Sequence, residues 1–291
     1  MSKFFNIILI ATIILLSAQC KEVETAVITD PSQLPLFDST YVSSSNIAEV
    51  PKNVLMEEFS GVRCANCPAG TLKTKEISSN NPGRVTVMAI HSNFLAAPYD
   101  DSPDLRNDDA QEMALAPLGP IGGKPSTYIN RTIFGSAVNI VVPDPNTWES
   151  FVNQELATTT PIDMKLESIF QDINERTVRY RITLNFAQQA TGVNLGFALT
   201  ESNIKAEQLD GSTKIKDYKH EHVLRSFIGS IYGETLTASI EANTVIIKEF
   251  EIDLDDEDFD PAVEWKMENM ELVAFTRSSD QKIINSTHIE L

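Results

Sequence analysis

The chain has 291 residues, of which 42% are hydrophobic and 22% are charged, a balance typical of folded domains rather than of disordered chains. Its 23 Lys and Arg residues are outnumbered by 41 Asp and Glu residues, and the formal net charge is −18 at pH 7. A polyanion binds through a surplus of basic residues, so the composition argues against nucleic acid as a partner.

The first 19 residues have the pattern of a secretory signal. One early Lys precedes an apolar stretch over residues 4–16, and small residues follow before Cys20. Residues 16–20 resemble a lipobox, in which Cys20 would be acylated and become the mature N-terminus, although Gln19 replaces the usual small residue. The alternative is an ordinary signal peptide that is cut nearby, with Cys20 incidental.

Residues 20–50 show little hydrophobic periodicity and contain turn-forming residues such as Pro31 and Pro35 and the polar run 43–46. We therefore predict an extended tether between the membrane and the folded part of the chain. Two or more acyl chains on Cys20, at ~0.8 kcal/mol per buried methylene, would form a stable anchor.

A strand, a turn, a helix and a second strand are predicted next, with two cysteines in the turn. Residues 53–59 are apolar enough for a buried strand, and Cys64-Ala65-Asn66-Cys67 follows. Pro68 is tolerated in a first helical turn, so the helix begins there and ends at Asn80-Asn81-Pro82-Gly83. Residues 84–91 are typical of a central parallel strand. This order predicts a βαβ unit with the cysteines at the start of its helix.

The chain has three cysteines, so two remain as a pair if Cys20 carries lipid. A disulfide between Cys64 and Cys67 would close so short a loop that it constrains the unfolded chain little. A zinc site is a second possibility, but only His220 and His222 could complete it, and their one-residue separation is unusual for paired ligands. Redox chemistry is the leading interpretation. Helix amides lower the pKa of the first thiol, so Cys64 would attack and Cys67 would resolve.

Residues 58–68, with the sequence Glu-Phe-Ser-Gly-Val-Arg-Cys-Ala-Asn-Cys-Pro, resemble the active-site segment of thioredoxins. In that family an acidic residue lies six positions before the first Cys, and a Phe follows it directly. The resemblance implies that Glu58 is a buried acid that transfers the proton of Cys67.

Residues 121–129 look like the thioredoxin loop that carries a cis-proline before a strand. The resemblance implies that Pro125 lies opposite the disulfide and that the backbone before it pairs with an extended substrate. The intervening segment, residues 94–120, is longer than in thioredoxin and contains a predicted helix over 104–115. Periplasmic thiol–disulfide enzymes often carry an inserted helix at this place.

Longer patterns extend the resemblance over residues 54–289. They comprise residues 57–70, 123–131, 218–225 and 283–285. On these patterns the chain is similar to the 28-kilodalton outer-membrane-protein family of Bacteroidota lipoproteins. That resemblance implies a thioredoxin-like domain followed by a β domain, tethered at the outer membrane, and it implies no assigned activity.

The second half of the chain changes its hydrophobic period. A helix is predicted from Pro145 to Leu156, and residues 158–161 form a boundary between a first domain over 51–159 and a second over 160–291. Beyond it the apolar residues alternate with polar ones. The predicted strands cover residues 162–166, 178–186, 193–200, 222–228, 244–254, 271–277 and 282–291. About seven such strands suggest an all-β immunoglobulin-like sandwich, which can be a binding module or a spacer.

Further candidate sites have a functional and a structural interpretation. His220 and His222 would share one face of a strand and could bind a metal or respond to pH, but exposed loop-and-strand histidines are the simpler explanation. The acidic run 253–260 could bind calcium or be a solvated turn. His91 could lie near the disulfide or be a packed histidine at a strand end. Motifs for phosphate loops, serine hydrolases and zinc proteases are missing, and we expect no cofactor.

Two functions stay open at this point. The first is a cell-envelope lipoprotein with a thioredoxin-like domain that performs thiol–disulfide exchange with the thiols or disulfides of exported proteins. The second is a surface binding or adhesion lipoprotein in which the disulfide is structural or vestigial. Replacing both Cys64 and Cys67 by Ser would abolish the first function and leave the second nearly intact.

Overall fold

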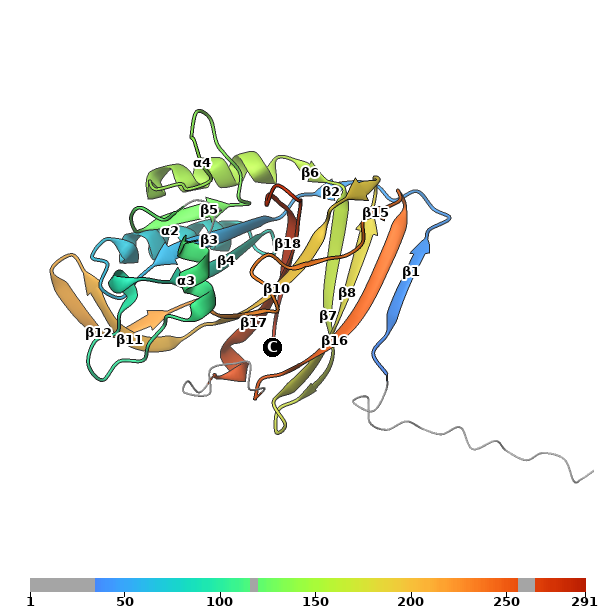
Figure 1. Cartoon of the computed structure of the whole chain (residues 1–291). Coiled ribbons are helices and arrows are strands. Elements are labelled where there is room, and N and C mark those ends of the chain that lie inside the picture. Colours follow the sequence, from blue (N-terminus) through green and yellow to red (C-terminus); the bar gives the residue numbers. More distant parts are fainter. Residues whose placement is uncertain (1–34, 116–119, 256–264) are drawn as a thin grey trace, which may run out of the picture. The chain divides into compact units, whose positions relative to one another are not determined.

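The computed structural model describes residues 35–115, 120–255 and 265–291 (Figure 1). The predicted signal peptide and Cys20 lie outside these residues. The part of the chain from Pro35 to Leu291 forms one compact unit. In its described residues the strands form one sheet of eight strands, one of four and three of two.

The first part of this unit alternates strands and helices. Strand β3 (Val54–Ser60) leads into helix α2 (Cys67–Asn80), and β4 (Val85–His91) returns parallel to β3. Strand β5 (Ser126–Ile129) pairs antiparallel with the other side of β3. All residues of these three strands are buried, which explains why they are mostly apolar, with Glu57 and Glu58 of β3 as buried exceptions. The predicted βαβ unit is confirmed.

Helices cover both faces of these strands. Helix α4 (Pro145–Leu156) begins after Asp144, whose side chain accepts a hydrogen bond from the Asn146 amide, and it matches the predicted helix. Residues of α2 and α4 pack on one face, and α3 (Asp108–Leu115) packs on the other. Within the described part of the chain, none of the helices has the length and apolar character needed to cross a bilayer.

Helix α3 is shorter than the helix predicted over 104–115. Asn107 accepts a hydrogen bond from the Ala110 amide at 2.7 Å and thereby caps the helix start. Before it, the Asp104 carboxylate accepts from both the amide and the guanidinium of Arg106, which forms a local turn instead of helix. Two short 3₁₀ helices complete the helical elements of the described residues, η2 (Phe94–Ala96) and η3 (Met267–Asn269).

The eight-stranded sheet continues beyond the βαβ unit. Its order is β18-β17-β10-β13-β4-β3-β5, with β14 paired to β10. The added strands are β10 (Asn194–Glu201), β13 (Val223–Ile228), β14 (Glu234–Thr235), β17 (Met270–Arg277) and β18 (Ile283–Glu290). Strand β13 lies parallel to β4, with Val223 opposite Ala89. The sheet therefore combines strands from both sides of the predicted boundary at residue 159.

The four-stranded sheet has the order β1-β16-β8-β7. Its long strands are β7 (Ile162–Asp172), β8 (Thr177–Phe186) and β16 (Thr244–Asp253). Their buried side chains, such as Leu184, form one apolar core with side chains of β10 and β17, such as Leu272. The seven strands predicted after residue 160 are all present, and the second half is β-rich as expected. The immunoglobulin-like topology stays a prediction.

The prediction of a tether up to residue 50 is wrong for β1 (Asp38–Val42). This strand pairs antiparallel with β16, from Asp38 opposite Lys248 to Val42 opposite Thr244. It is an edge strand with mostly exposed side chains, so its sequence carries no apolar alternation. The backbone hydrogen bonds to β16 define this strand.

One further hairpin was not predicted. Strands β11 (Ile204–Asp210) and β12 (Thr213–His220) pair antiparallel around a turn in which Gly211 has a φ of +55°. Because Asp210 pairs with Thr213, the loop has two residues, Gly211-Ser212, and a Gly-Ser pair between two strands is a hairpin signal that could have revealed this turn. Paired two-residue strands complete the described strands: β2 (Val50–Pro51) with β6 (Thr159–Thr160), and β9 (Ala190–Thr191) with β15 (Ser239–Ile240).

Candidate functional site

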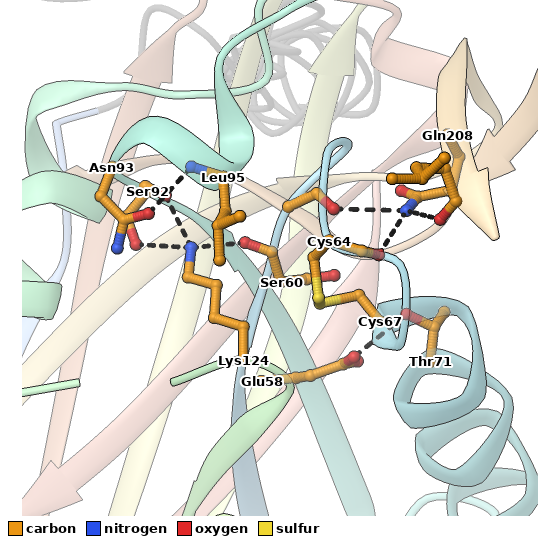
Figure 2. The surroundings of a disulfide bond; sticks show 12 residues. Glu58, Ser60, Cys64, Cys67, Thr71, Ser92, Asn93, Leu95, Lys124 and Gln208 are labelled. Atoms are coloured by element: carbon orange, nitrogen blue, oxygen red, sulfur yellow. Dashed lines mark hydrogen bonds between the residues drawn. A yellow bond between two sulfur atoms is a disulfide. The ribbon is translucent and has the colours of Figure 1, made fainter. Parts of the chain in front are cut away.

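Cys64 and Cys67 form a disulfide where the turn after β3 enters α2 (Figure 2), and their Cα atoms are 5.3 Å apart. Cys67 is the first residue of the helix, with Pro68 next to it as the sequence predicts. The Cys64 amide donates to the Gly61 carbonyl, and the Cys67 amide donates to the Cys64 carbonyl. Cys64 is 4% exposed and Cys67 is 1% exposed. The two sulfurs therefore lie at a helix N-terminus, where free amides favour a thiolate once the bond is reduced.

Glu58 lies beneath this helix start with 1% of its surface exposed. Its carboxyl accepts hydrogen bonds from the hydroxyls of Thr71 and Thr74, both at 3.0 Å. Burial raises the pKa of Glu58 to about 7, while the two hydroxyls oppose the rise. Figure 2 shows the carboxyl pointing to Thr71 of α2 in the surroundings of the disulfide. An acid with this pKa can both give and take a proton near neutral pH. Its role in proton transfer stays a prediction.

Pro125 follows a cis peptide bond after Lys124 and packs on the same helix. A Cβ atom built on Gly70 would lie 2.7 Å from the Cβ of Pro125 and 3.2 Å from the ring of Trp148. Because Gly70 has no side chain, the proline loop can approach the first turn of α2 closely. Pro125 therefore packs on the helical turn that begins with Cys67. A substrate-docking role for the backbone before Pro125 stays a prediction.

Lys124 is a residue of this region that the sequence reasoning did not single out. Its ammonium donates to the carbonyls of Ser60 and Ser92, both at 2.6 Å, and to the Ser92 hydroxyl at 3.0 Å. Burial lowers the pKa of Lys124 to about 7, whereas three acceptors match the three N–H bonds of the charged form. Lys124 ties the proline loop to the ends of β3 and β4. Its place directly before Pro125 was a signal that could have indicated it.

The unpredicted hairpin covers the outer side of the cysteine turn. The Leu209 amide donates to the Val62 carbonyl at 2.8 Å, and the Gly211 amide donates to the Ala65 carbonyl at 2.9 Å. The side-chain amide of Gln208 donates to the carbonyls of Gly61 at 3.3 Å and Cys64 at 3.2 Å, as Figure 2 shows. Gln208 and Leu209 of β11 and Gly211 of the hairpin turn therefore all bond to the turn that contains the disulfide.

The histidines are more buried than predicted. His220 is 4% exposed because the hairpin brings the end of β12 back against β4, where its ring centroid is 5.4 Å from that of His91. Burial lowers the pKa of His220 to about 4 and that of His91 well below its ordinary value. The prediction of a packed histidine at residue 91 is confirmed, whereas the expectation that His220 is exposed is wrong.

His222 lies outside β12, with a φ of +52°, and its ring is 3.2 Å from the Glu271 carboxylate. Burial lowers the pKa of His222, but the hydrogen bond and charge of Glu271 outweigh it and the net direction is upward. His220 and His222 therefore do not present one shared strand face. Among the residues that the structure describes, no three His, Cys, Asp or Glu side chains cluster as metal ligands would.

The acidic run 253–260 falls mostly outside the described residues. Asp253 ends β16, and the Asp255 carboxylate forms an ion pair with Arg176 at 2.7 Å. Residues 256–260 lie outside the described part of the chain, so the calcium hypothesis stays a prediction.

Two of the patterns that carry the family resemblance have structural roles around β3. In the pattern 123–131, Arg131 forms an ion pair with Glu57 at 2.6 Å, and both side chains are 0% exposed. In the closing pattern 283–285, Asn285 accepts from the Asn53 amide at 3.0 Å and donates to the Ile162 carbonyl at 2.8 Å. These contacts join the segment before β3 to β7 and β18, and thereby fix the strand that carries Glu58.

Comparison with protein families gives one match. The family model of the outer membrane protein Omp28 matches residues 115–291. The match includes Pro125 and the β11–β12 hairpin, and it begins after Glu58, Cys64 and Cys67. No curated protein matches the sequence closely enough to count as a relative.

Solved structures provide a fold likeness. HBP35 of Porphyromonas gingivalis has a TM-score of 0.65 at 19% identity, over 83% of this chain and 76% of that chain. A protein of Agrobacterium tumefaciens has a TM-score of 0.48 at 12% identity, over 83% and 96% of the two chains. A domain of the outer membrane lipoprotein Omp28 from P. gingivalis has a TM-score of 0.29 at 12% identity, over 45% and 88%. Only the first likeness is strong enough to support the overall fold.

Proposed function

The chain belongs to the Omp28 outer membrane protein family, and on that premise we propose that it is a lipoprotein that performs thiol–disulfide exchange on exported proteins. Its location at the outer membrane of the cell envelope follows from the family. Lipidation at Cys20 would supply the anchor. The oxidising cell envelope is the compartment in which a disulfide can form and be exchanged.

A thioredoxin-like fold for residues 51–159 is part of this proposal. It is supported by the parallel β3–α2–β4 unit, the antiparallel strand β5 and the proline loop that packs on α2. The position of the cysteines at the junction of strand and helix also agrees with this assignment. The family match does not include the cysteines, so the activity depends on the site itself.

The observation that carries the proposal is the buried carboxyl of Glu58 beneath the disulfide. Burying a carboxyl group costs free energy, which a purely structural disulfide gives no reason to accept. Burial raises the pKa of Glu58 to about 7. At that value the group can protonate a leaving thiolate and be ready to accept the proton back in the reverse step.

The exchange proceeds in two displacements. A substrate thiolate attacks Sγ of Cys64, which forms a mixed disulfide and breaks the bond to Cys67, and the Cys67 thiolate takes the proton of Glu58. A second substrate thiolate then attacks the substrate sulfur of the mixed disulfide and releases Cys64 as a thiolate. The substrate dithiol has lost two electrons and the Cys64–Cys67 pair has gained them. Run in reverse, the reduced pair reduces a substrate disulfide, and the potentials of the two pairs set the direction.

The test compares exchange rates of the full chain with a secreted protein that carries free thiols or non-native disulfides, between pH 5 and 9. The double variant Cys64→Ser/Cys67→Ser should lose the activity. Glu58→Gln should lower the rate by at least about tenfold and remove the titration near pH 7. Glu76→Gln, on the exposed surface of the same helix, is the control and should match the wild type. Equal rates for Glu58→Gln and the wild type across this range would contradict the proposal.

A surface binding protein with a structural disulfide is the second candidate function. The low exposure of both cysteines favours it, since an attacking thiol needs access to Cys64. This alternative expects a reduction potential below about −300 mV for the pair. It also expects that the Cys64→Ser/Cys67→Ser variant keeps its ligand binding. A glutathione titration of the pair separates the two candidates.

A further inference from the structure

The β11–β12 hairpin is attached to the molecule in an unusual way. In the described part of the chain its two strands pair only with each other. Most side chains of β12 are exposed, so this strand contributes little to a core. The contacts of β11 are concentrated on the turn that contains Cys64 and Cys67. The hairpin therefore needs an explanation other than completion of a sheet.

Three hydrogen-bond donors of β11 and its turn bond to backbone carbonyls of the cysteine turn. The amides of Leu209 and Gly211 donate to the carbonyls of Val62 and Ala65, and the Gln208 side chain donates to the carbonyl of Cys64 itself. These are the backbone groups on the outer side of the disulfide, to which an extended peptide approaching Cys64 could bond. The hairpin thus donates hydrogen bonds to the same carbonyls that a bound substrate strand would use.

Side chains close the same side of the site. Gln208 is 2% exposed, and Ala206 packs in a small apolar cluster with Val62, Leu105 and Val223. Above this cluster, the Arg63 guanidinium and the Lys214 ammonium both lie over the ring of Tyr99, at 4.3 and 4.1 Å from its centroid. Beside these contacts Cys64 is only 4% exposed, although a nucleophile must reach its sulfur in line with the disulfide bond.

The base of the hairpin is defined on both sides. Asn203 and His222 have positive φ values of 60° and 52°. The Asn203 amide donates to the Glu221 carboxylate, and the His222 amide donates to the Ser202 hydroxyl, both at 3.0 Å. Beyond this base the hairpin is held by its hydrogen bonds to the cysteine turn, by the cluster around Ala206, by a bond from the Glu207 amide to the Ser102 hydroxyl and by packing of the end of β12 on β4. A segment whose contacts are as local as these can open without global unfolding.

We propose that the β11–β12 hairpin is a built-in cap of the Cys64–Cys67 disulfide, and that an exchange partner is an extended polypeptide segment that displaces it. The partner would take over the carbonyls of Val62 and Ala65 and present its own thiol to Sγ of Cys64. This proposal rests on the proposed exchange function for the identity of the partner. The capping itself is measurable without any protein substrate.

The experiment measures how fast the disulfide of the full chain is reduced by dithiothreitol, with alkylation and a gel shift as the readout. Gln208→Ala removes the two side-chain bonds to the carbonyls of Gly61 and Cys64, leaves the backbone bonds of the hairpin in place, and should speed the reduction by about fivefold. A shortened hairpin, in which a Gly-Ser link joins the cross-strand neighbours Lys205 and Lys219, should speed it on the order of 100-fold. Lys216→Ala, on the exposed side of β12, is the control and should stay within about twofold of the wild type.

Equal reduction rates for the wild type, Gln208→Ala and the shortened chain would overturn the cap. If the shortened chain does not fold by circular dichroism, Gln208→Ala decides alone. Fast reduction of the shortened chain, without exchange on any protein substrate, would support the cap and contradict the proposed function. If the wild type and the shortened chain exchange disulfides with a protein substrate at equal rates, the result would support the proposed function and contradict the proposal that the hairpin is a cap.

Discussion

The two ends of the eight-stranded sheet differ in what they bury. At the end formed by β10, β17 and β18, apolar side chains face the four-stranded sheet in a core that includes Leu184 and Leu272, and the ionisable side chains of Glu201 and Arg277 are buried beside it. At the end formed by β3, β4 and β5, the buried groups include the polar residues Glu57, Glu58 and His91. The first end resembles an ordinary sandwich core. The second buries groups whose desolvation is costly unless they are hydrogen-bonded.

The two ends of the sheet should therefore differ in how their contributions to the free energy of unfolding depend on pH. Apolar burial stabilises the fold at every pH, because it involves no titrating group. The charge state of Glu58 depends on pH near neutrality, and so does any chemistry that uses its proton. The following changes test this contrast, from the largest expected effect to the smallest.

The largest effect is expected from Arg131→Met, which leaves the Glu57 carboxylate buried without its partner. Both side chains are 0% exposed, so the free energy of unfolding should fall by about 4 kcal/mol in a urea titration. The control is Lys165→Met, which removes an exposed ion pair with Glu167 on the four-stranded sheet and should change it by less than about 0.5 kcal/mol. Similar losses for both variants would show that burial of the pair does not matter.

Glu58→Gln tests the pH dependence of the end formed by β3, β4 and β5. Burial raises the pKa of Glu58 from 4.5 to about 7, so the folded state keeps a proton that the unfolded chain releases. The stability of the wild type should therefore fall by about 3 kcal/mol relative to Glu58→Gln as pH rises from 4.5 to 7, and then stay level.

The matched control for that pH series is Leu184→Ala in the sandwich core. Leu184 is 0% exposed, and its truncation should cost about 3 kcal/mol at every pH between 4.5 and 8. Chemical denaturation at several pH values measures both variants. If the free energies of unfolding of the wild type and Glu58→Gln differed by the same amount at every pH, the proposed contrast between the two ends would be wrong.

The smallest effect concerns the contact between the proline loop and α2. Gly70→Ala gains helix propensity, but its Cβ would lie 2.7 Å from the Cβ of Pro125, so a net loss of about 1 to 2 kcal/mol is expected. Gly122→Ala is the control, because its Cβ would meet no atom within 4 Å, and it should change stability by less than about 0.5 kcal/mol. Thermal unfolding measures both, and a stabilised Gly70→Ala would contradict the close approach.

The elements that could be predicted from the sequence are those with local signals. Strand β3, helix α2 and strand β4 follow from apolar runs bounded by proline and glycine, and the long strands of the sandwich follow from alternation. The spacing of Glu58 and Pro125 around the cysteines came from the thioredoxin resemblance. In these cases the residues that determine the structure lie close together in the chain.

The elements that were missed depend on distant partners. The β11–β12 hairpin has a polar, Lys-rich second strand, and its contacts are backbone carbonyls near Cys64. Lys124 bonds mainly to main-chain oxygens of Ser60 and Ser92, for which no side-chain pattern exists. Strand β1 is defined only by its pairing with β16. Every residue has a main-chain carbonyl, so a hydrogen bond to that group requires no particular residue type and produces no sequence pattern.

The pairing of β13 with β4 has a consequence for any attempt to express residues 51–159 as a separate fragment. The Ala89 amide of β4 donates to the His222 carbonyl at 2.7 Å, and all residues of β4 are buried. A fragment that stops at residue 159 would leave this apolar strand as an open edge. Such edges recruit strands from neighbouring copies, so the fragment should aggregate when expressed alone. Through β13, the C-terminal part of the chain thus covers the strand edge of the segment that bears the cysteines.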